Sequence, residues 1–341
     1  MSIDGVIGAV SAHGLRVIDE APSIRPEDAA EVLRRCESEH LTGLLDQAVA
    51  DRAVLADERT ARLVGAAALS TQAWTLLVER RHLLVHELLR VDDVEHRFIK
   101  GPTVAHRFYE HAGLRPFRDV DVLVHGDDLD RTVALLEAHG HRRYRPELAP
   151  GFSAHHGKSV TMVGPEGIEV DVHRTLASGP FGAVASPEVL WRRSSAPVSV
   201  GGDELPSLDT AAALLHACVH SVTGVRTAIG SLRDVAQVAG AVDSVSEVRA
   251  LAEELGVVAC IAEAARRAAD VVGDDTPMLR ELSDWPIRRR ERAWLDLYVR
   301  RAGYTSLSWG ALRATPGARA KAHLAVSLVR ARRGKAAVDA G

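Results

Sequence analysis

Two aspartates alternate with valines in the stretch 118–124, Arg-Asp-Val-Asp-Val-Leu-Val. In a β-strand alternate side chains share one face, so Asp119 and Asp121 point the same way while the valines point into the core. Like charges one pleat apart repel each other, and strands normally avoid this arrangement. A divalent cation reverses the sign of the interaction, and Mg²⁺ prefers one or two carboxylates completed by water and phosphate oxygens. The stretch therefore predicts a metal site.

The stretch 168–173, Ile-Glu-Val-Asp-Val-His, repeats this alternation. If the two strands are neighbours, Asp171 joins Asp119 and Asp121, and three carboxylates can hold two metal ions. Asp171 is then predicted to be both a metal ligand and the general base for an acceptor hydroxyl. A single Asp-x-Asp is more often a solvated strand face, but two alternating acidic strands favour a site.

The elements that position these residues can be read between residues 96 and 200. Pro102 suits the first position of a short helix, and Gly113 suits its end. After the first acidic strand, Asp127 or Asp128 is expected to cap a helix that ends at Gly140. Strands near 157–163 and 167–173 flank Gly-Pro-Glu-Gly, which predicts a hairpin.

Helical periodicity fills residues 26 to about 93 and returns from Ser207 almost to the C-terminus. We therefore predict an α+β fold in which a small mixed sheet with helices is flanked by helical regions. The expected regions are 1–95 (helical), 96–200 (α/β core) and 201–341 (helical, with a basic tail from Arg313 to Lys335).

The composition restricts the class of protein. The chain has 341 residues, 46% of them hydrophobic, so a sizeable core can form. A net charge of −4 and only 4% aromatic residues argue against a general nucleic-acid binder. Cys36, Cys218 and Cys260 are far apart, which favours buried thiols over a disulfide framework or a zinc site. We expect a cytoplasmic protein, because the sequence shows neither a leader peptide nor a membrane span.

The chain resembles the uncharacterised nucleotidyltransferase family of bacteria, within the DNA-polymerase-β-like superfamily. The resemblance covers roughly residues 60–240. The matching elements are Phe98-Ile99-Lys100-Gly101, Tyr109, Gly113, Arg115, the 118–124 strand, Val170-Asp171-Val172-His173, His216, His220 and Leu232-Arg233-Asp234. The paired-aspartate strand is the specific part, and the histidine and Arg-Asp matches are softer.

The resemblance implies a polymerase-β-like nucleotidyltransferase core that binds metal through Asp119, Asp121 and Asp171. Most of the superfamily grips the triphosphate with a Gly-Ser pair about ten residues before the first aspartate. Here that role is expected to fall to Lys100 and Gly101, since glycine allows close backbone approach, the following helix offers free N–H groups, and lysine adds a point charge.

Further phosphate contacts are expected from Thr103, Arg118 and Lys158. Lys158 is placed with His155 and His156 on a strand facing the site, although a solvated hairpin edge is the competing interpretation.

Three residues are expected to support the site. Arg115 either grips phosphate or pairs with Asp119, and His173 hydrogen-bonds a carboxylate. Arg233 either pairs locally with Asp234 or braces the nucleotide. His216 and His220 have the i, i+4 spacing of zinc ligands, but the packed apolar helix around them favours ordinary buried histidines.

The predicted reaction is transfer of a nucleoside monophosphate from an NTP, with ATP as the expected donor, to an acceptor hydroxyl, with release of pyrophosphate. The predicted cofactor is Mg²⁺, or Mn²⁺ in its place. The acceptor is unidentified and can be a small molecule, a peptide or a protein. Two rivals remain open: another phosphoryl-transfer enzyme on the same scaffold, and a non-catalytic nucleotide-binding regulatory protein.

Overall fold

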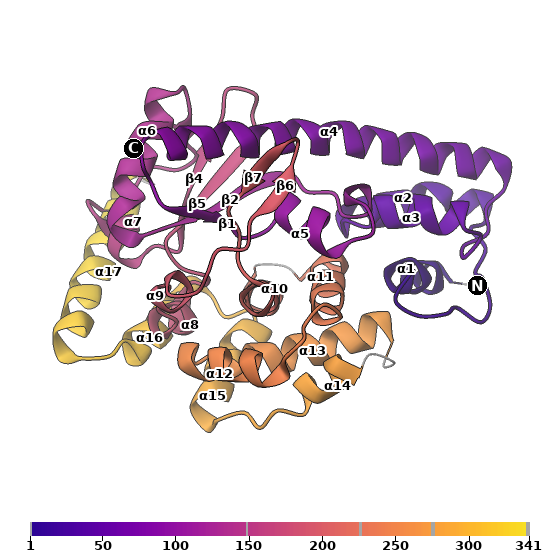
Figure 1. Cartoon of the computed structure of the whole chain (residues 1–341). Coiled ribbons are helices and arrows are strands. Elements are labelled where there is room, and N and C mark those ends of the chain that lie inside the picture. Colours follow the sequence, from indigo (N-terminus) through magenta and orange to yellow (C-terminus); the bar gives the residue numbers. More distant parts are fainter. Residues whose placement is uncertain (1, 148, 225–226, 274–276, 339–341) are drawn as a thin grey trace.

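The computed structural model describes residues 2–147, 149–224, 227–273 and 277–338, with side chains described to residue 331. A central sheet lies between a long helix, α4, on one side and the C-terminal helices on the other (Figure 1). The N-terminal helices gather at one end of α4, and α16 and α17 lie at the opposite end of the molecule. The fold is α+β with a small mixed sheet, which confirms the predicted class.

The main sheet has five strands in the order β1-β2-β5-β4-β3. Strand β2 pairs in parallel with β5 and antiparallel with β1, while β4 forms antiparallel pairs with both β5 and β3. A separate two-stranded ribbon is formed by β6 and β7. The bounds are β1 (His96–Phe98), β2 (Asp119–Val124), β3 (Arg142–Arg143), β4 (Ser159–Val163), β5 (Glu169–His173), β6 (Val198–Val200) and β7 (Asp203–Leu205).

The two faces of β2 meet different parts of the chain. Val120, Val122 and Val124 are fully buried against α4 and α6, together with the valines of β5. Leu123, on the face that also carries the two aspartates, belongs instead to the core formed with the C-terminal helices. The predicted inward orientation of the valines is thus confirmed, and the acidic face is covered by helices as well.

The N-terminal helices brace the segment that leads into β2. These are α1 (Ile3–Ala12), α2 (Ala29–Ser38), α3 (Thr42–Ala50) and α4 (Glu58–Val91). Helix α3 packs on the short 3₁₀ turn η2 (Ala112–Leu114) so closely that a Cβ at Gly43 would lie 2.0 Å from the carbonyl oxygen of Gly113. The absence of a side chain at residue 43 therefore allows α3 to pack closely on the segment before Arg115.

The C-terminal half is helical, as its periodicity predicted. Its helices are α10 (Thr210–Thr223), α11 (Ile229–Ala239), α12 (Val245–Leu255), α13 (Val258–Val272), α14 (Pro277–Ser283), α15 (Arg289–Val299), α16 (Tyr304–Ala314) and α17 (Ala318–Val338). The basic stretch from Arg313 falls in α16 and α17. Through the described parts of the chain, every helix is too short or too polar to cross a bilayer.

Two local predictions within the core region were wrong. The core helices are α5 (Pro102–Phe108), α6 (Leu129–Ala138), α7 (Phe152–His156), α8 (Gly179–Val184) and α9 (Glu188–Trp191). Helix α5 begins at Pro102 as expected but ends at Phe108 rather than near Gly113, because Tyr109 is extended and its hydroxyl reaches Asp234.

His155 and His156 lie on α7, not on a strand. Gly151 adopts a left-handed conformation (φ 72°) that starts this helical turn, and the buried Phe152 anchors it against Ala331.

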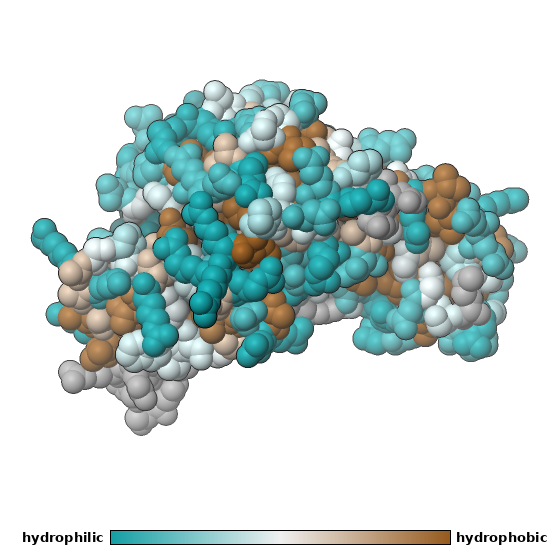
Figure 2. All heavy atoms as spheres, turned by 90° about the horizontal axis from the view of Figure 1, so that it is seen from below, coloured by the Kyte–Doolittle hydropathy of each residue, from teal (hydrophilic) through white to brown (hydrophobic). Residues whose placement is uncertain are grey.

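The face seen from below is mainly hydrophilic (Figure 2). Its hydrophobic residues lie in separate small groups rather than in one broad patch. This face of the described chain therefore presents polar and charged side chains to its surroundings.

Replacing Gly43 with alanine tests the packing of α3 on η2. The added methyl group meets a backbone oxygen that cannot rotate away, so we expect Gly43→Ala to lower the free energy of unfolding by about 2 kcal/mol or more. Urea denaturation measures the change.

Gly65→Ala on α4 is the matched control, because its nearest neighbour lies at an ordinary 3.7 Å. This substitution should raise stability by up to about 1 kcal/mol, since alanine favours helix. Equal effects of the two changes would contradict the close approach.

Candidate functional site

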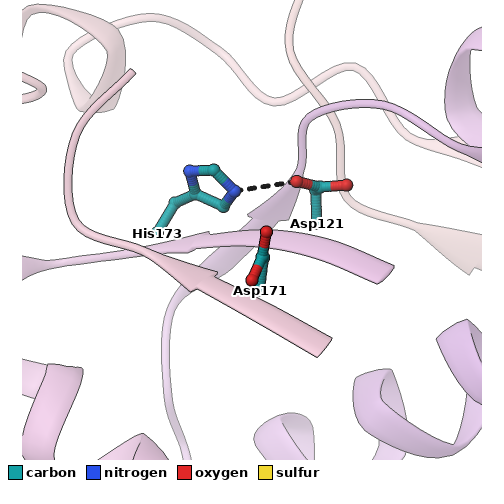
Figure 3. A group of neighbouring side chains, drawn as sticks. All are labelled: Asp121, Asp171 and His173. Carbon is teal, nitrogen blue, oxygen red and sulfur yellow. Dashed lines mark hydrogen bonds and ion pairs between the residues drawn. The ribbon is translucent and has the colours of Figure 1, made fainter. Parts of the chain in front are cut away.

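The two acidic strands are neighbours, and their register places Asp121 directly opposite Asp171. Ligand atoms of Asp121, Asp171 and His173 all lie within 4.8 Å of one another. Figure 3 shows the His173 ring directed at the Asp121 carboxylate, with Asp171 beside them. The structure thus brings together two of the three predicted carboxylates and adds an imidazole.

Asp119 lies one pleat away, at the open end of the site. Its side chain is 37% exposed, whereas that of Asp121 is 2% exposed. Lys100 links the two, because its Nζ lies 3.3 Å from Asp119 Oδ2 and 2.8 Å from Asp121 Oδ2. The ammonium group therefore partly neutralises the pair of carboxylates.

The protonation of this group follows from its charges. Burial opposes the charged form of Lys100, but Asp121 and Asp119 outweigh it and raise the lysine pKa. Burial also opposes ionisation of Asp121, yet Lys100 and His173 together hold its pKa well below the ordinary value. Burial and the neighbouring Asp121 raise the pKa of Asp119. The inner carboxylate is therefore the firmly ionised member.

Hydrogen bonds fix the orientation of the inner carboxylates. His173 Nε2 lies 2.8 Å from Asp121 Oδ1, while its Nδ1 is buried and makes no hydrogen bond to the described residues. Thr161 Oγ1 donates to Asp171 Oδ1 at 2.5 Å from the adjacent strand β4. Each acidic side chain is thus held from a neighbouring residue, which reduces its freedom before any ligand binds.

Lys158 precedes β4 and is half-buried near the carboxylates. Burial lowers the pKa of its ammonium group, against the opposing influence of Asp121 and Asp171. Its Nζ forms no ion pair with any residue that the structure describes. The side chain therefore offers a positive charge that the protein itself leaves unpaired.

Gly101 follows Lys100 in a left-handed conformation, with φ of 70°. A Cβ here would lie 2.7 Å from Nε2 of His82, a fully buried residue on α4. His82 Nδ1 is 2.9 Å from the carbonyl of Val78, while Nε2 makes no hydrogen bond to the described residues. The space that glycine leaves open is thus filled by a histidine ring, and burial lowers its pKa to about 4.

Arg115 forms a two-pronged ion pair with Asp234 of α11. Its Nε and Nη2 lie 2.8 and 2.7 Å from the two carboxylate oxygens, and the Tyr109 hydroxyl donates to the same carboxylate at 2.8 Å. Arg115 Nη1 also lies 3.3 Å from the Gly101 carbonyl. The expected pairing of Asp234 with Arg233 is replaced by this link between the core and the C-terminal helices.

The remaining predicted residues contact other parts of the protein. Arg118 pairs with Glu37 at 3.0 Å, and Thr103 donates to the Lys100 carbonyl at 3.1 Å. Arg233 is buried and donates to the backbone carbonyls of residues 11 and 13. Of the three, Thr103 and Arg233 therefore hold the fold in place, whereas Arg118 is half-exposed at the mouth of the site.

A cavity of about 520 Å³ opens beside Asp119 and Lys100. It lies between the core and helices α10 and α11, and its cationic side chains include Arg115 and Arg118. His216 and His220 line the α10 side, with ring centroids 5.9 Å apart. Burial lowers the pKa of both rings, that of His216 to about 3, so they are neutral and uncharged lining groups.

Thr161 and His82 were missed in the sequence, and Asp234 was singled out there but with Arg233 rather than Arg115 as its partner. Thr161 could have been found, because the hairpin register sets it opposite Asp171. His82 and Asp234 reach the site from distant helices, and no spacing pattern in the sequence indicates those contacts.

Comparisons with known proteins identify the family of this chain. Residues 25–273 match the model of a family described as uncharacterised nucleotidyltransferase. Among solved structures, the chain is similar to an antigenic nucleotidyltransferase-like protein from Paracoccidioides brasiliensis, with 12% identity and a TM-score of 0.36 over 61% of this chain and 92% of that one. A likeness at that TM-score carries no argument about this site. No curated protein matches the chain.

The chain belongs to the family of uncharacterised nucleotidyltransferases, because the match extends over most of its length. The family membership that the paired-aspartate strand indicated is confirmed.

Removing the charge of Asp234 tests the link between the core and the helices. Asp234→Asn leaves the Arg115 guanidinium without its counter-charge in a largely buried setting, so we expect a loss of about 3 kcal/mol in the free energy of unfolding. Glu37→Gln breaks the exposed Arg118 pair and should cost about 1 kcal/mol or less. Urea titration of both variants measures the difference, and similar losses would refute the structural role of Asp234.

The buried His82 predicts a stability loss in acid. Its folded-state pKa is about 4 against 6.5 ordinarily, so below pH 6.5 the unfolded chain binds a proton that the folded chain does not. Stability is retained above pH 6.5 and falls as the pH drops toward 4.

We expect His82 to contribute about 2 kcal/mol of the loss between pH 7.5 and 5. His82→Gln should remove that part of the pH dependence, measured by urea denaturation at both pH values. The exposed His139→Gln is the control, and equal pH dependence in the two variants would contradict the assignment.

Proposed function

We propose that this chain transfers a nucleoside monophosphate from an NTP to a hydroxyl group of an acceptor and releases pyrophosphate. The observation that carries the proposal is the parallel register that sets Asp121 beside Asp171, with Lys100 and Lys158 close by. Membership of the nucleotidyltransferase family supports the same reaction class.

The donor set fits a hard divalent cation such as Mg²⁺ or Mn²⁺. Asp121 and Asp171 present neighbouring carboxylates, and Asp119 can add a third from the open end. Carboxylate oxygens are the ligands these cations prefer, and His173 serves better as the group that orients Asp121. When bound, such a cation neutralises phosphate charge and activates the attacking hydroxyl.

The lysines are suited to the triphosphate. Lys158 has no counter-ion among the described side chains, so a phosphate oxygen would relieve the cost of burying its charge. Lys100 already contacts two carboxylates and can also face phosphate from the cavity it lines. Arg118 adds a charge at the cavity mouth.

Asp171 is assigned the general-base role. Thr161 holds one of its oxygens, which fixes the direction of the carboxylate. In the proposed step the acceptor oxygen attacks the α-phosphorus, its proton passes to Asp171, and the bond to the pyrophosphate oxygen breaks. Charge and atoms balance, because pyrophosphate leaves with the electron pair of that bond.

Asp121→Asn tests the proposal. The asparagine keeps the shape of the side chain but loses the charge that pairs with Lys100, so we expect metal-dependent NTP turnover to fall at least 1,000-fold, by analogy with the loss of a central catalytic group. Turnover is measured as pyrophosphate release from an NTP mixture with Mg²⁺ and candidate acceptors, followed by mass spectrometry of the products.

The control is Asp127→Asn, which alters an acidic residue outside the site on the turn η3 (Gly126–Asp128). Full activity of Asp121→Asn would sink the assignment. Release of ADP instead of pyrophosphate would show phosphoryl transfer, and the absence of Mg²⁺-dependent NTP binding would favour a regulatory protein.

A further inference from the structure

A second cavity, of about 780 Å³, lies at the other end of the central strands. The first cavity includes Asp119 and Glu169, where β2 and β5 begin. The second includes Arg174 and Thr175, directly after β5 ends at His173. The inner carboxylates therefore lie along the strands between two cavities.

The lining of the second cavity is cationic or neutral. Its ionisable side chains are His155 and His156 from α7, Arg174, and Arg319 and His323 from α17. Among the described lining residues there is no carboxylate. The first turn of α17, which begins at Ala318, also lines it, and a helix N-terminus favours negative charge.

Arg174 is the distinctive member of this set. Its Nε donates to the Gly157 carbonyl at 3.1 Å, and within the described chain its terminal nitrogens have no hydrogen bond or ion pair. Burial lowers its pKa, and no carboxylate acts against that effect. By contrast, the partly buried Arg115 and Arg193 both pair with carboxylates.

The histidines could suggest a metal instead. His156 Nε2 lies 3.1 Å from His323 Nδ1, and His155 packs against His323 with ring centroids 5.5 Å apart. Two arginines in the same lining would repel a cation, however, and would attract an anion. Neutral imidazoles can donate hydrogen bonds to an oxyanion, so all five side chains are consistent with one ligand class.

We propose that this cavity binds a phosphate group carried by the acceptor, held by Arg174, Arg319 and the histidine pair His156 and His323. That the phosphate belongs to the acceptor depends on the proposed function. The binding of phosphate in this cavity does not depend on it. Arg174 is three residues beyond Asp171, so their backbones are separated by roughly 10 Å, a span that a small phosphorylated molecule could cover.

Imidazole resonances provide a local measurement of binding. Inorganic phosphate is titrated into the full chain in EDTA while ¹H–¹⁵N spectra of the histidine rings are recorded, with His323→Gln used for assignment. We expect the His156 and His323 signals to shift and saturate. Repeating the titration on Lys100→Met, which alters the first cavity, distinguishes phosphate binding there from phosphate binding in the second cavity.

Arg174→Gln should weaken the response of those two histidines at least tenfold, because a charged hydrogen-bond donor to phosphate is lost. Arg131→Gln is the matched control, since Arg131 lies on α6 outside both cavities. Circular dichroism confirms that each variant is folded, and His156→Gln provides a second test of the same cavity.

Several results would overturn the assignment. These are an unchanged response in both Arg174→Gln and His156→Gln, acetate binding as tightly as phosphate, or Zn²⁺ shifting the histidines where phosphate does not. Asp121→Asn should bind phosphate here as the unaltered chain does. If phosphate binds but no variant, nor the unaltered chain, turns over NTP, the proposed reaction fails while the phosphate site stands.

Discussion

Repulsion among carboxylates on adjacent strands is the constraint around which this structure is arranged. Asp121 and Asp171 stand side by side in a parallel register, and Asp119 is one pleat away. Such a group is unstable in a largely buried setting unless positive charge and hydrogen bonds surround it. Lys100 supplies the charge, and His173 and Thr161 supply hydrogen bonds. The residues that relieve the repulsion come from three separate segments, so the site exists only where those segments meet.

The helices hold those segments in place. On one face of the sheet, α4 places His82 beneath Gly101 and so supports the turn that carries Lys100. On the other face, α11 provides Asp234, which ties Arg115 to the C-terminal helices. Both contacts converge on Gly101, which His82 approaches directly and Asp234 reaches through Arg115, so movement of either helix would be felt at the residue next to Lys100. The helical regions therefore act as the support of the site, in addition to contributing the walls of its cavities.

Much of the sheet could be predicted from the sequence, because period-two alternation and hairpin glycines are local signals. The pairing of Asp121 with Asp171 followed from two such strands being neighbours. The contacts between distant segments were less accessible. On helix α4 the side chain of Leu69 is 69% exposed, whereas Arg81 is buried and pairs with Glu166 of the β4–β5 hairpin. A prediction from hydrophobicity alone would bury Leu69 and expose Arg81. The partner of Arg115 could not be predicted for the same reason, since Asp234 lies far along the chain.

The order of strands also bears on how the chain reaches this state. His173 and Asp121 are 52 residues apart in sequence, and α6, β3, α7 and β4 lie between β2 and β5 along the chain. Pairing across so long a separation carries a large loop-closure entropy and is typical of a slow step in folding. During synthesis the aspartates of β2 emerge well before their parallel neighbour. The acidic cluster therefore cannot assemble before β5 has been synthesised and has paired with β2.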